Sequence, residues 1–163
     1  MRYHNITKDD MLNGEGLRTV LWVAGCSHHC PQCHNPVTWD INGGLVFDEQ
    51  AKEELFEERK KDYVSGVTFS GGDPFHLENR EEIGALAKEI REKFPDKTIW
   101  LYTGYEWEEI CHLSFLSNID VIVDGKFKIE EKDNNLHWKG SANQRVIDVK
   151  ASLRAGEVRL YQE

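Results

Sequence analysis

Residues 18–33, RTVLWVAGCSHHCPQC, join an apolar run directly to three cysteines. The run from Arg18 to Ala24 is rich in β-branched and aromatic residues, which predicts a buried strand. Gly25 ends that strand, and Pro31 discourages a helix in the segment that follows. We therefore expect the cysteines to lie in an irregular loop at the carboxyl end of a strand, which is where α/β folds place their sites.

The three cysteines of this loop, Cys26, Cys30 and Cys33, have the spacing C-x3-C-x2-C. Closely spaced thiolates are typical ligands of iron–sulfur clusters, and a [4Fe–4S] cluster normally takes four of them. Three protein ligands leave one iron with an open position, the arrangement that separates catalytic from structural metal sites. The spacing predicts a [4Fe–4S] cluster with one iron available to a further ligand.

A zinc site is the alternative interpretation of this segment, with His28, His29 or His34 as a fourth ligand. Zinc-binding modules usually pair one C-x2-C with a second, distant pair of ligands, whereas Cys111 is the only other cysteine. We expect His28 and His29 to face solvent between the cluster ligands. Cys111 has helical spacing to Trp107 and is expected to be a small core residue.

Strand-like and helix-like segments alternate along the rest of the chain. Asp48 is placed to cap a helix over residues 48–62. Asn79 and Glu82 have the spacing of a capping box at the start of a second helix, which Pro95 ends. Short apolar runs predict further strands at 66–69, 98–102, 119–123 and 145–149.

This alternation predicts an α/β fold with a mostly parallel sheet and right-handed crossovers. The chain has 163 residues, whereas a complete eight-fold barrel typically needs about 250. We therefore expect an open, partial (β/α) barrel that forms a single domain over residues 1–163.

Composition narrows the classes of partner. A formal net charge of -9 and a pI of about 5.3 argue against nucleic acid. No apolar run approaches the length of about 20 residues that a membrane span requires, and the N-terminus lacks a signal-peptide core. Cysteines clustered at metal-ligand spacing are typical of the reducing cytoplasm rather than of a disulfide framework. We expect a cytoplasmic protein without a membrane partner.

Six short motifs resemble those of one enzyme family. CSHHCPQCHN at 26–35 resembles the cluster motif of radical S-adenosylmethionine enzymes, and NGEGLR at 13–18 resembles the glycine motif of glycyl-radical activating enzymes. The others are FSGGDP at 69–74, similar to a Gly-Gly-Glu-Pro motif, YTGY at 102–105, VDGKF at 123–127 and GSANQR at 140–145. The set and the short length most resemble the activating proteins of anaerobic ribonucleotide reductases.

The resemblance implies an oxidoreductase with an open, partial barrel of the radical S-adenosylmethionine type. Its two cofactors would be a [4Fe–4S] cluster and S-adenosylmethionine. Cys26, Cys30 and Cys33 would hold three irons, and the fourth iron would bind the amino and carboxylate groups of S-adenosylmethionine. Reduced flavodoxin or a similar donor would supply one electron for cleavage of the sulfonium. The resulting 5′-deoxyadenosyl radical would take a hydrogen atom from a glycine of the large reductase subunit, its polypeptide partner.

The resemblance also implies which residues contact S-adenosylmethionine. The amino end of the ligand would meet backbone groups of the glycine motif, formed by Ser70, Gly71, Gly72 and Asp73. Asp73 stands where the family often has Glu, so its shorter side chain is not expected to reach the ligand in the same way. Thr103, after a later strand, is a candidate for a hydrogen bond to the ribose or carboxylate, or for capping the next helix.

The position just before the third cysteine departs from the family pattern. Many members have an aromatic residue just before Cys33, near the adenine, and this chain has Gln32 there. The Gln32 amide could pair with the polar edge of adenine, and His34 could supply a flat surface. Alternatively, His34 is a loop histidine bonded to the backbone.

Four basic and polar residues have open roles. Arg18 either begins the first strand or meets the partner protein or the ligand carboxylate. Lys126, Asn143 and Arg145 are candidates for a rim that faces the partner, on resemblance alone.

Three other functions fit the same motifs. The chain could activate a different glycyl-radical enzyme, although such activators tend to be longer. It could be a small radical enzyme that acts on a free metabolite. It could also be a zinc-binding interaction module without catalysis, which iron, sulfide and zinc analysis would distinguish.

Overall fold

The computed structural model describes residues 1–33 and 36–162. Its strands are β1 (Arg2–Asp10), β2 (Arg18–Val23), β3 (Leu45–Val46), β4 (Gly66–Gly71), β5 (Thr98–Tyr102), β6 (Val121–Asp124) and β7 (Arg145–Asp148). Its α-helices are α1 (Glu49–Arg59), α2 (Arg80–Lys93), α3 (Trp107–Ile110) and α4 (Val149–Ala155). Short 3-10 helices are η1 (Pro36–Thr38), η2 (Ser114–Asn118) and η3 (Ile129–Glu131).

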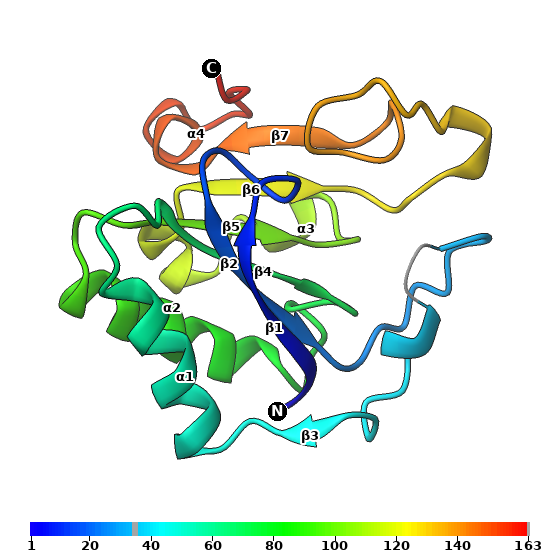
Figure 1. The fold of residues 1–163 in the computed structure, drawn as a ribbon. Helices are drawn as coiled ribbons and strands as arrows, with labels where there is room; N and C mark the ends of the chain where they lie inside the picture. Colours follow the sequence, from blue (N-terminus) through cyan, green and yellow to red (C-terminus); the bar gives the residue numbers. More distant parts are fainter. Residues whose placement is uncertain (34–35, 163) are drawn as a thin grey trace.

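The described strands form one mixed sheet in the order β3-β1-β2-β4-β5-β6-β7. The pairs β2–β4, β4–β5 and β5–β6 are parallel, whereas β1 runs antiparallel to β2 and β3, and β7 runs antiparallel to β6. The α/β class is therefore confirmed, but parallel pairing is confined to the middle of the sheet. The sheet is not closed, because β3 and β7 form its two edges (Figure 1).

The main core lies between the sheet and helices α1 and α2, which lie on one face of it (Figure 1). Side chains alternate across a strand, so Ile99 and Leu101 of β5 point to this core and are fully buried. Helix α2 contributes Ile83, Leu86 and Ile90 at helical spacing.

The opposite face of the sheet carries a smaller aromatic cluster. Trp100 of β5 packs edge-on against Trp138 and Tyr161, with ring centroids 4.9 and 5.2 Å away. Val121 and Val123 of β6 complete the buried part of the cluster. Trp138 and Tyr161 come from the segments on either side of β7, so both segments cover part of this face.

Arg18 lies fully buried at the start of β2. Its guanidinium donates to the carbonyl oxygens of Glu15 (2.9 Å), Val67 (2.9 Å) and Thr98 (2.8 Å), and to the hydroxyls of Thr68 and Thr98. Every acceptor belongs to this chain, so Arg18 joins β2, β4 and β5 at their amino ends. The structure thus favours its role at the start of the first strand over a partner or ligand contact.

The two predicted helix starts have different outcomes. The Asp48 side chain accepts a hydrogen bond from the Ala51 amide at 2.9 Å, which confirms it as the N-cap of α1. The predicted capping box of Asn79 and Glu82 is wrong, because Asn79 makes no side-chain cap hydrogen bond. Its amide instead donates to the Ala24 carbonyl oxygen at 2.8 Å, which ties the start of α2 to the end of β2.

Two elements carry too weak an apolar pattern to be predicted. Strand β1 buries only Ile6, so its sequence lacks the alternation of a half-buried strand. Helix α4 is seven residues long and depends on its caps, with Asp148 at the N-terminus and Gly156 at φ 72° after the C-terminus. No helix in the described part of the chain has the length and apolar character needed to cross a bilayer.

The carboxyl ends of the parallel strands β2, β4, β5 and β6 meet at one edge of the sheet. The loops after these strands carry the cysteines, the glycine motif, Thr103 and the segment 125–144, and they project from the same end of the molecule (Figure 1). The topology therefore gathers the predicted site residues at this edge.

Candidate functional site

The cysteine loop leaves β2 and is pinned at its base to residues that follow it. The Gly25 amide donates to the Thr38 carbonyl oxygen at 2.7 Å, and the Cys26 amide donates to the Trp39 carbonyl oxygen at 3.1 Å. Inside the loop, the Cys33 amide donates to the Cys30 carbonyl oxygen at 3.1 Å. All three cysteines are partly buried and form no disulfide. The loop therefore carries three thiols, and hydrogen bonds to residues 38 and 39 fix its base.

Backbone donors surround two of the three sulfurs. Burial raises the pKa of Cys26 to about 11, and hydrogen bonds from the backbone amides of His28 and His29 oppose that rise. Burial also raises the pKa of Cys30, opposed by the Phe127 amide and by the charge of Lys126. The loop after β6 therefore reaches the cysteine loop. Iron loading must remove the thiol protons, so these donors favour the ligating thiolate.

These residues fit a cluster. Among the described residues, no three His, Cys, Asp or Glu side chains converge to hold a single metal ion. In a cluster each thiolate binds its own iron, and backbone amides directed at sulfur stabilise the negative charge. Three thiols on one loop with such amides around them provide that donor set.

The glycine motif packs against the base of the cysteine loop. The Gly72 amide donates to the Val23 carbonyl oxygen at 2.8 Å, and the Asp73 amide donates to the Gly25 carbonyl oxygen at 2.7 Å. A Cβ on Gly72 would lie 2.5 Å from that Gly25 oxygen and 2.7 Å from the Thr38 oxygen. Gly72, which the resemblance implies is a backbone contact of the ligand, therefore also leaves space for the cysteine loop.

A cavity of about 360 Å³ lies beside this junction on the aromatic face of the sheet. Cys33 and Ser70 both line it, so the structure brings together one predicted metal ligand and one predicted S-adenosylmethionine contact. Its other lining residues come from β2, β5, the loop before β2 and the segment 127–144, and are Leu12, Asn13, Trp22, Tyr102, Phe127, Leu136, Trp138, Lys139, Gly140 and Gln144.

Asp73 and Thr103 lie behind the cavity rather than in its wall. The Asp73 carboxylate is 1% exposed and accepts hydrogen bonds from the Thr103 hydroxyl (2.8 Å) and from the amides of Phe75 (2.8 Å) and Gly104 (2.9 Å). The Thr103 hydroxyl also accepts from the Tyr105 amide at 3.1 Å. A ligand contact to either side chain would compete with these buried hydrogen bonds.

The histidines and Gln32 of the cysteine loop differ in environment. The prediction that His28 faces solvent is wrong, because its side chain is 7% exposed and its Nε2 lies 2.6 Å from Asp73 Oδ2. His29 is exposed and packs on Trp39, with ring centroids 4.4 Å apart. Gln32 is also exposed, at φ 55°. The predicted role of His34 falls outside the described residues.

Cys111 is not a core residue. It is exposed at the end of α3, where its sulfur lies 3.9 Å from the Glu108 carbonyl oxygen. The prediction failed because α3 is only four residues long, so helical spacing extends over a single turn.

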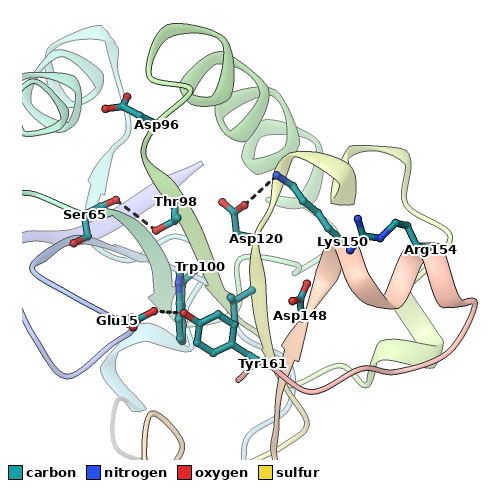
Figure 2. Close-up of a pocket in the computed structure, with 11 residues that line it drawn as sticks. Glu15, Ser65, Asp96, Thr98, Trp100, Asp120, Asp148, Lys150, Arg154 and Tyr161 are labelled. Carbon is teal, nitrogen blue, oxygen red and sulfur yellow. Dashed lines mark hydrogen bonds and ion pairs between the residues drawn. The ribbon is translucent and has the colours of Figure 1, made fainter. Parts of the chain in front are cut away.

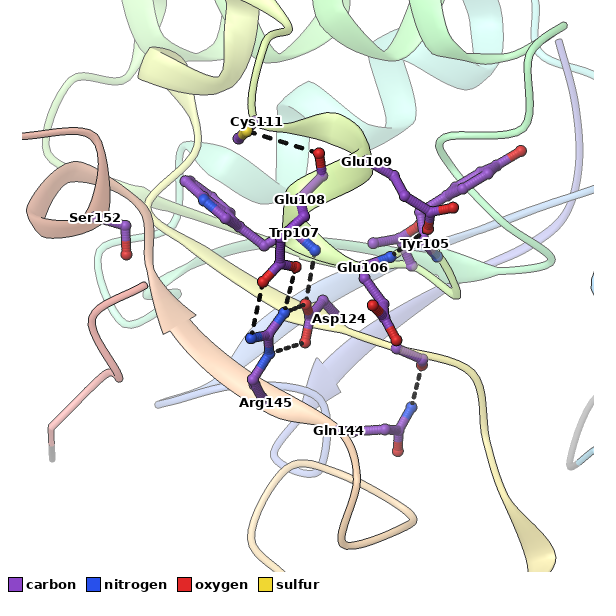
Figure 3. A network of polar contacts seen from close by, with 12 residues as sticks. Tyr105, Glu106, Trp107, Glu108, Glu109, Cys111, Asp124, Gln144, Arg145 and Ser152 are labelled. Carbon is purple, nitrogen blue, oxygen red and sulfur yellow. Dashed lines mark hydrogen bonds and ion pairs between the residues drawn. The ribbon is translucent and has the colours of Figure 1, made fainter. Parts of the chain in front are cut away.

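The predicted rim residue Arg145 is engaged in a polar network on β7 (Figure 3). Its guanidinium contacts the buried Asp124 carboxylate at 2.6 Å and Glu108 at 2.9 Å, and Asp124 also accepts from the Trp107 amide at 2.8 Å. Hydrogen bonds to the two carboxylates raise the pKa of Arg145 above its usual range, and the Arg145 contact lowers the pKa of Glu108. Arg145 thus joins β6, β7 and α3.

We expect Arg145→Met to destabilise the protein by about 1–3 kcal/mol, because it leaves the Asp124 carboxylate buried with one charged partner fewer. The thermal midpoint should fall by about 2–4 °C per kcal/mol, measured on the cluster-loaded protein without oxygen. Arg154→Met on the exposed side of α4 is the matched control and should change stability by less than about 0.5 kcal/mol. Equal midpoints for the two variants would contradict a structural role for Arg145.

A second cavity, of about 720 Å³, lies at the amino ends of the parallel strands (Figure 2). Thr98 and Trp100 of β5, Tyr161 and the α4 residues Lys150 and Arg154 are among its eleven lining residues. No cysteine lines it, and it adjoins the opposite edge of the sheet from the thiols. We therefore place the candidate site at the smaller cavity, where the metal-binding chemistry is.

Comparison with known proteins identifies the family of this chain. A family described as a 4Fe-4S single cluster domain matches residues 12–147, a span that includes all three loop cysteines. Anaerobic ribonucleoside-triphosphate reductase-activating proteins are similar over most of their length. That of Enterobacteria phage T4 is 43% identical over 146 residues, covering 90% of this chain and 93% of the relative. That of Escherichia coli K12 is 39% identical over 150 residues, covering 90% and 97%. This chain therefore belongs to the family of anaerobic ribonucleoside-triphosphate reductase-activating proteins.

Proposed function

We propose that this chain is the activase that generates a glycyl radical on an anaerobic ribonucleotide reductase. One observation carries the proposal: Cys26, Cys30 and Cys33 share a loop whose last thiol lines a cavity at the carboxyl edge of the sheet. The names of the relatives add the polypeptide substrate, which the cavity alone does not identify.

The two cofactors have distinct places in this proposal. The three thiolates would hold three irons of a [4Fe–4S] cluster, and S-adenosylmethionine would occupy the adjoining cavity, with Ser70, Gly71 and Gly72 toward its amino end. When bound, the cofactors supply reductive cleavage of the sulfonium and a 5′-deoxyadenosyl radical that takes hydrogen from a glycine. Gln32 and His34 are the candidate neighbours of the adenine.

The protein contributes positioning and exclusion of water. Backbone amides of His28, His29 and Phe127 donate toward the sulfurs and lower the cost of their negative charge. Trp22 and Tyr102 supply apolar walls to the cavity, which limit side reactions of a radical with solvent. Asp73 and Thr103 act from behind the wall by holding the loops in place.

The unclosed sheet corresponds in this proposal to an open, partial barrel of the radical S-adenosylmethionine type, in a single domain. Leu12, at the mouth of the cavity, is 80% exposed. A glycine-bearing segment of the large reductase subunit would cover this side on docking and complete the pocket. The electron comes from an external donor, reduced flavodoxin or a similar protein, in the cytoplasm.

The test is radical transfer between purified proteins. Reconstituted chain, S-adenosylmethionine, reductant and the cognate anaerobic reductase subunit, mixed without oxygen, should give a glycyl-radical doublet in the electron paramagnetic resonance spectrum. Radical formation should require the cluster-loaded chain. A subunit whose radical glycine is changed to alanine should give no doublet, because the hydrogen that is removed belongs to that glycine.

Two results would contradict the proposal. A doublet on another glycyl-radical enzyme, with none on the reductase, would reassign the polypeptide substrate. Turnover of a free metabolite without any polypeptide radical would identify a small-molecule enzyme instead.

A further inference from the structure

His28 lies between the proposed cluster ligands Cys26 and Cys30, and its side chain contacts Asp73. The imidazole is 7% exposed, and its Nε2 lies 2.6 Å from the Asp73 carboxylate at the end of β4. This hydrogen bond occupies Nε2. The nitrogen that faces Asp73 is therefore not available to a metal.

Asp73 offers His28 a fixed acceptor. The carboxylate is buried, and it also accepts from the Phe75 amide in its own loop and from the Thr103 hydroxyl and Gly104 amide after β5. These donors hold the carboxylate from two neighbouring strand ends. A side chain bonded to Asp73 is thereby tied to the framework of the sheet.

Two further contacts confine the imidazole ring. The ring packs edge-on against Tyr105, with centroids 4.7 Å apart and an interplanar angle of 76°. On the Gly104 side, a Cβ built on that glycine would lie 2.4 Å from the ring carbon Cδ2. Gly104, Tyr105 and Asp73 therefore leave the ring one well-defined position.

The backbone of His28 connects this anchor to the cluster. Its amide is one of the two that donate to the Cys26 sulfur. Because the side chain of His28 is fixed, the position of its backbone amide is restrained as well. Cys26 is thus held relative to the end of β4, which carries the proposed S-adenosylmethionine contacts Ser70 and Gly71.

We propose that His28 is a positioning residue that, through Asp73, holds the Cys26 end of the cysteine loop in a fixed position relative to the glycine motif at residues 70–73. It is not a metal ligand in this proposal. The inference rests on the proposed function, because it assigns His28 a part in that reaction. Its loss should affect the relative placement of the two cofactors more than the presence of iron.

The test compares His28→Ala and His28→Gln with the wild-type chain. After anaerobic reconstitution, His28→Ala should retain iron and sulfide but cleave S-adenosylmethionine about 10–100-fold more slowly, the usual effect of losing a group that orients metal ligands. The change that S-adenosylmethionine causes in the spectrum of the reduced cluster should also be altered. His28→Gln keeps an N–H near the Nε2 position and should restore much of both. His112→Ala, at an exposed histidine, is the control and should match wild type.

Gly104→Ala should disturb the position of the His28 imidazole without changing His28 itself. Its added methyl group would lie 2.4 Å from the ring carbon Cδ2 of His28 and would push the imidazole away, so it should reproduce the slower cleavage. In the His28→Ala background the ring is gone, and the same change should have little further effect. Additive effects of the two changes would overturn the proposal.

Other outcomes separate this inference from the proposed function. His28→Ala with wild-type cleavage and spectra would overturn the positioning role while the activase function stands. Loss of iron in both His28→Ala and His28→Gln would make His28 a ligand and also overturn it. Each variant is compared with a wild-type chain whose cleavage activity is measured in parallel, so failure of the function itself would appear there.

Discussion

Changing any one of Cys26, Cys30 or Cys33 to alanine abolishes both the iron–sulfur cluster and cleavage of S-adenosylmethionine. Each variant leaves two protein thiolates for a cluster that normally takes four, so one iron loses its protein ligand. We expect iron and sulfide near background after reconstitution, and no 5′-deoxyadenosine after addition of reductant and S-adenosylmethionine.

Cys111→Ala is the matched control for these variants. Cys111 is exposed on α3, away from the cysteine loop, so its loss should leave iron content and cleavage unchanged. Loss of the cluster in Cys111→Ala, with a cluster retained in a loop variant, would contradict the ligand assignment.

The second large effect is expected for Gly72→Val, which should lower iron loading and S-adenosylmethionine binding together. A Cβ at this position would lie 2.5 Å from the Gly25 oxygen and 2.7 Å from the Thr38 oxygen, both backbone atoms at the base of the cysteine loop. Overpacking of this kind typically costs about 1–3 kcal/mol. The strain falls on the loop that carries the thiols, so the protein relieves it by moving the metal ligands.

Iron analysis and equilibrium binding of S-adenosylmethionine, measured on the same preparation, check this expectation. Gly156→Ala is the control, since no atom lies within 4 Å of its added Cβ, although φ 72° costs it about 1–2 kcal/mol of backbone strain. It should lower stability without changing iron content. Normal iron in Gly72→Val with weaker ligand binding would contradict this expectation and show that Gly72 makes room for the ligand instead.

Predictions from sequence succeeded where the signal lies in consecutive residues. The run from Arg18 to Ala24 became β2 with one residue fewer, and Asp48 caps α1 through a bond three residues ahead. The cysteine spacing likewise predicted a cluster domain, and the family match agrees with it. Each of these features depends on residues close together in the sequence, so it can be predicted without knowledge of the tertiary structure.

Tertiary structure decided the contacts that cross between strands. His28 and Asp73 are 45 residues apart, and no pattern in either segment indicates that they bond. Gly72 meets Gly25 because β2 and β4 pair in parallel, with Val23 opposite Gly71. Strand register brings distant segments to within a few ångströms, and it is set by the packing of the whole sheet. The motif residues could therefore be located from the chain, while the partners that orient them required the fold.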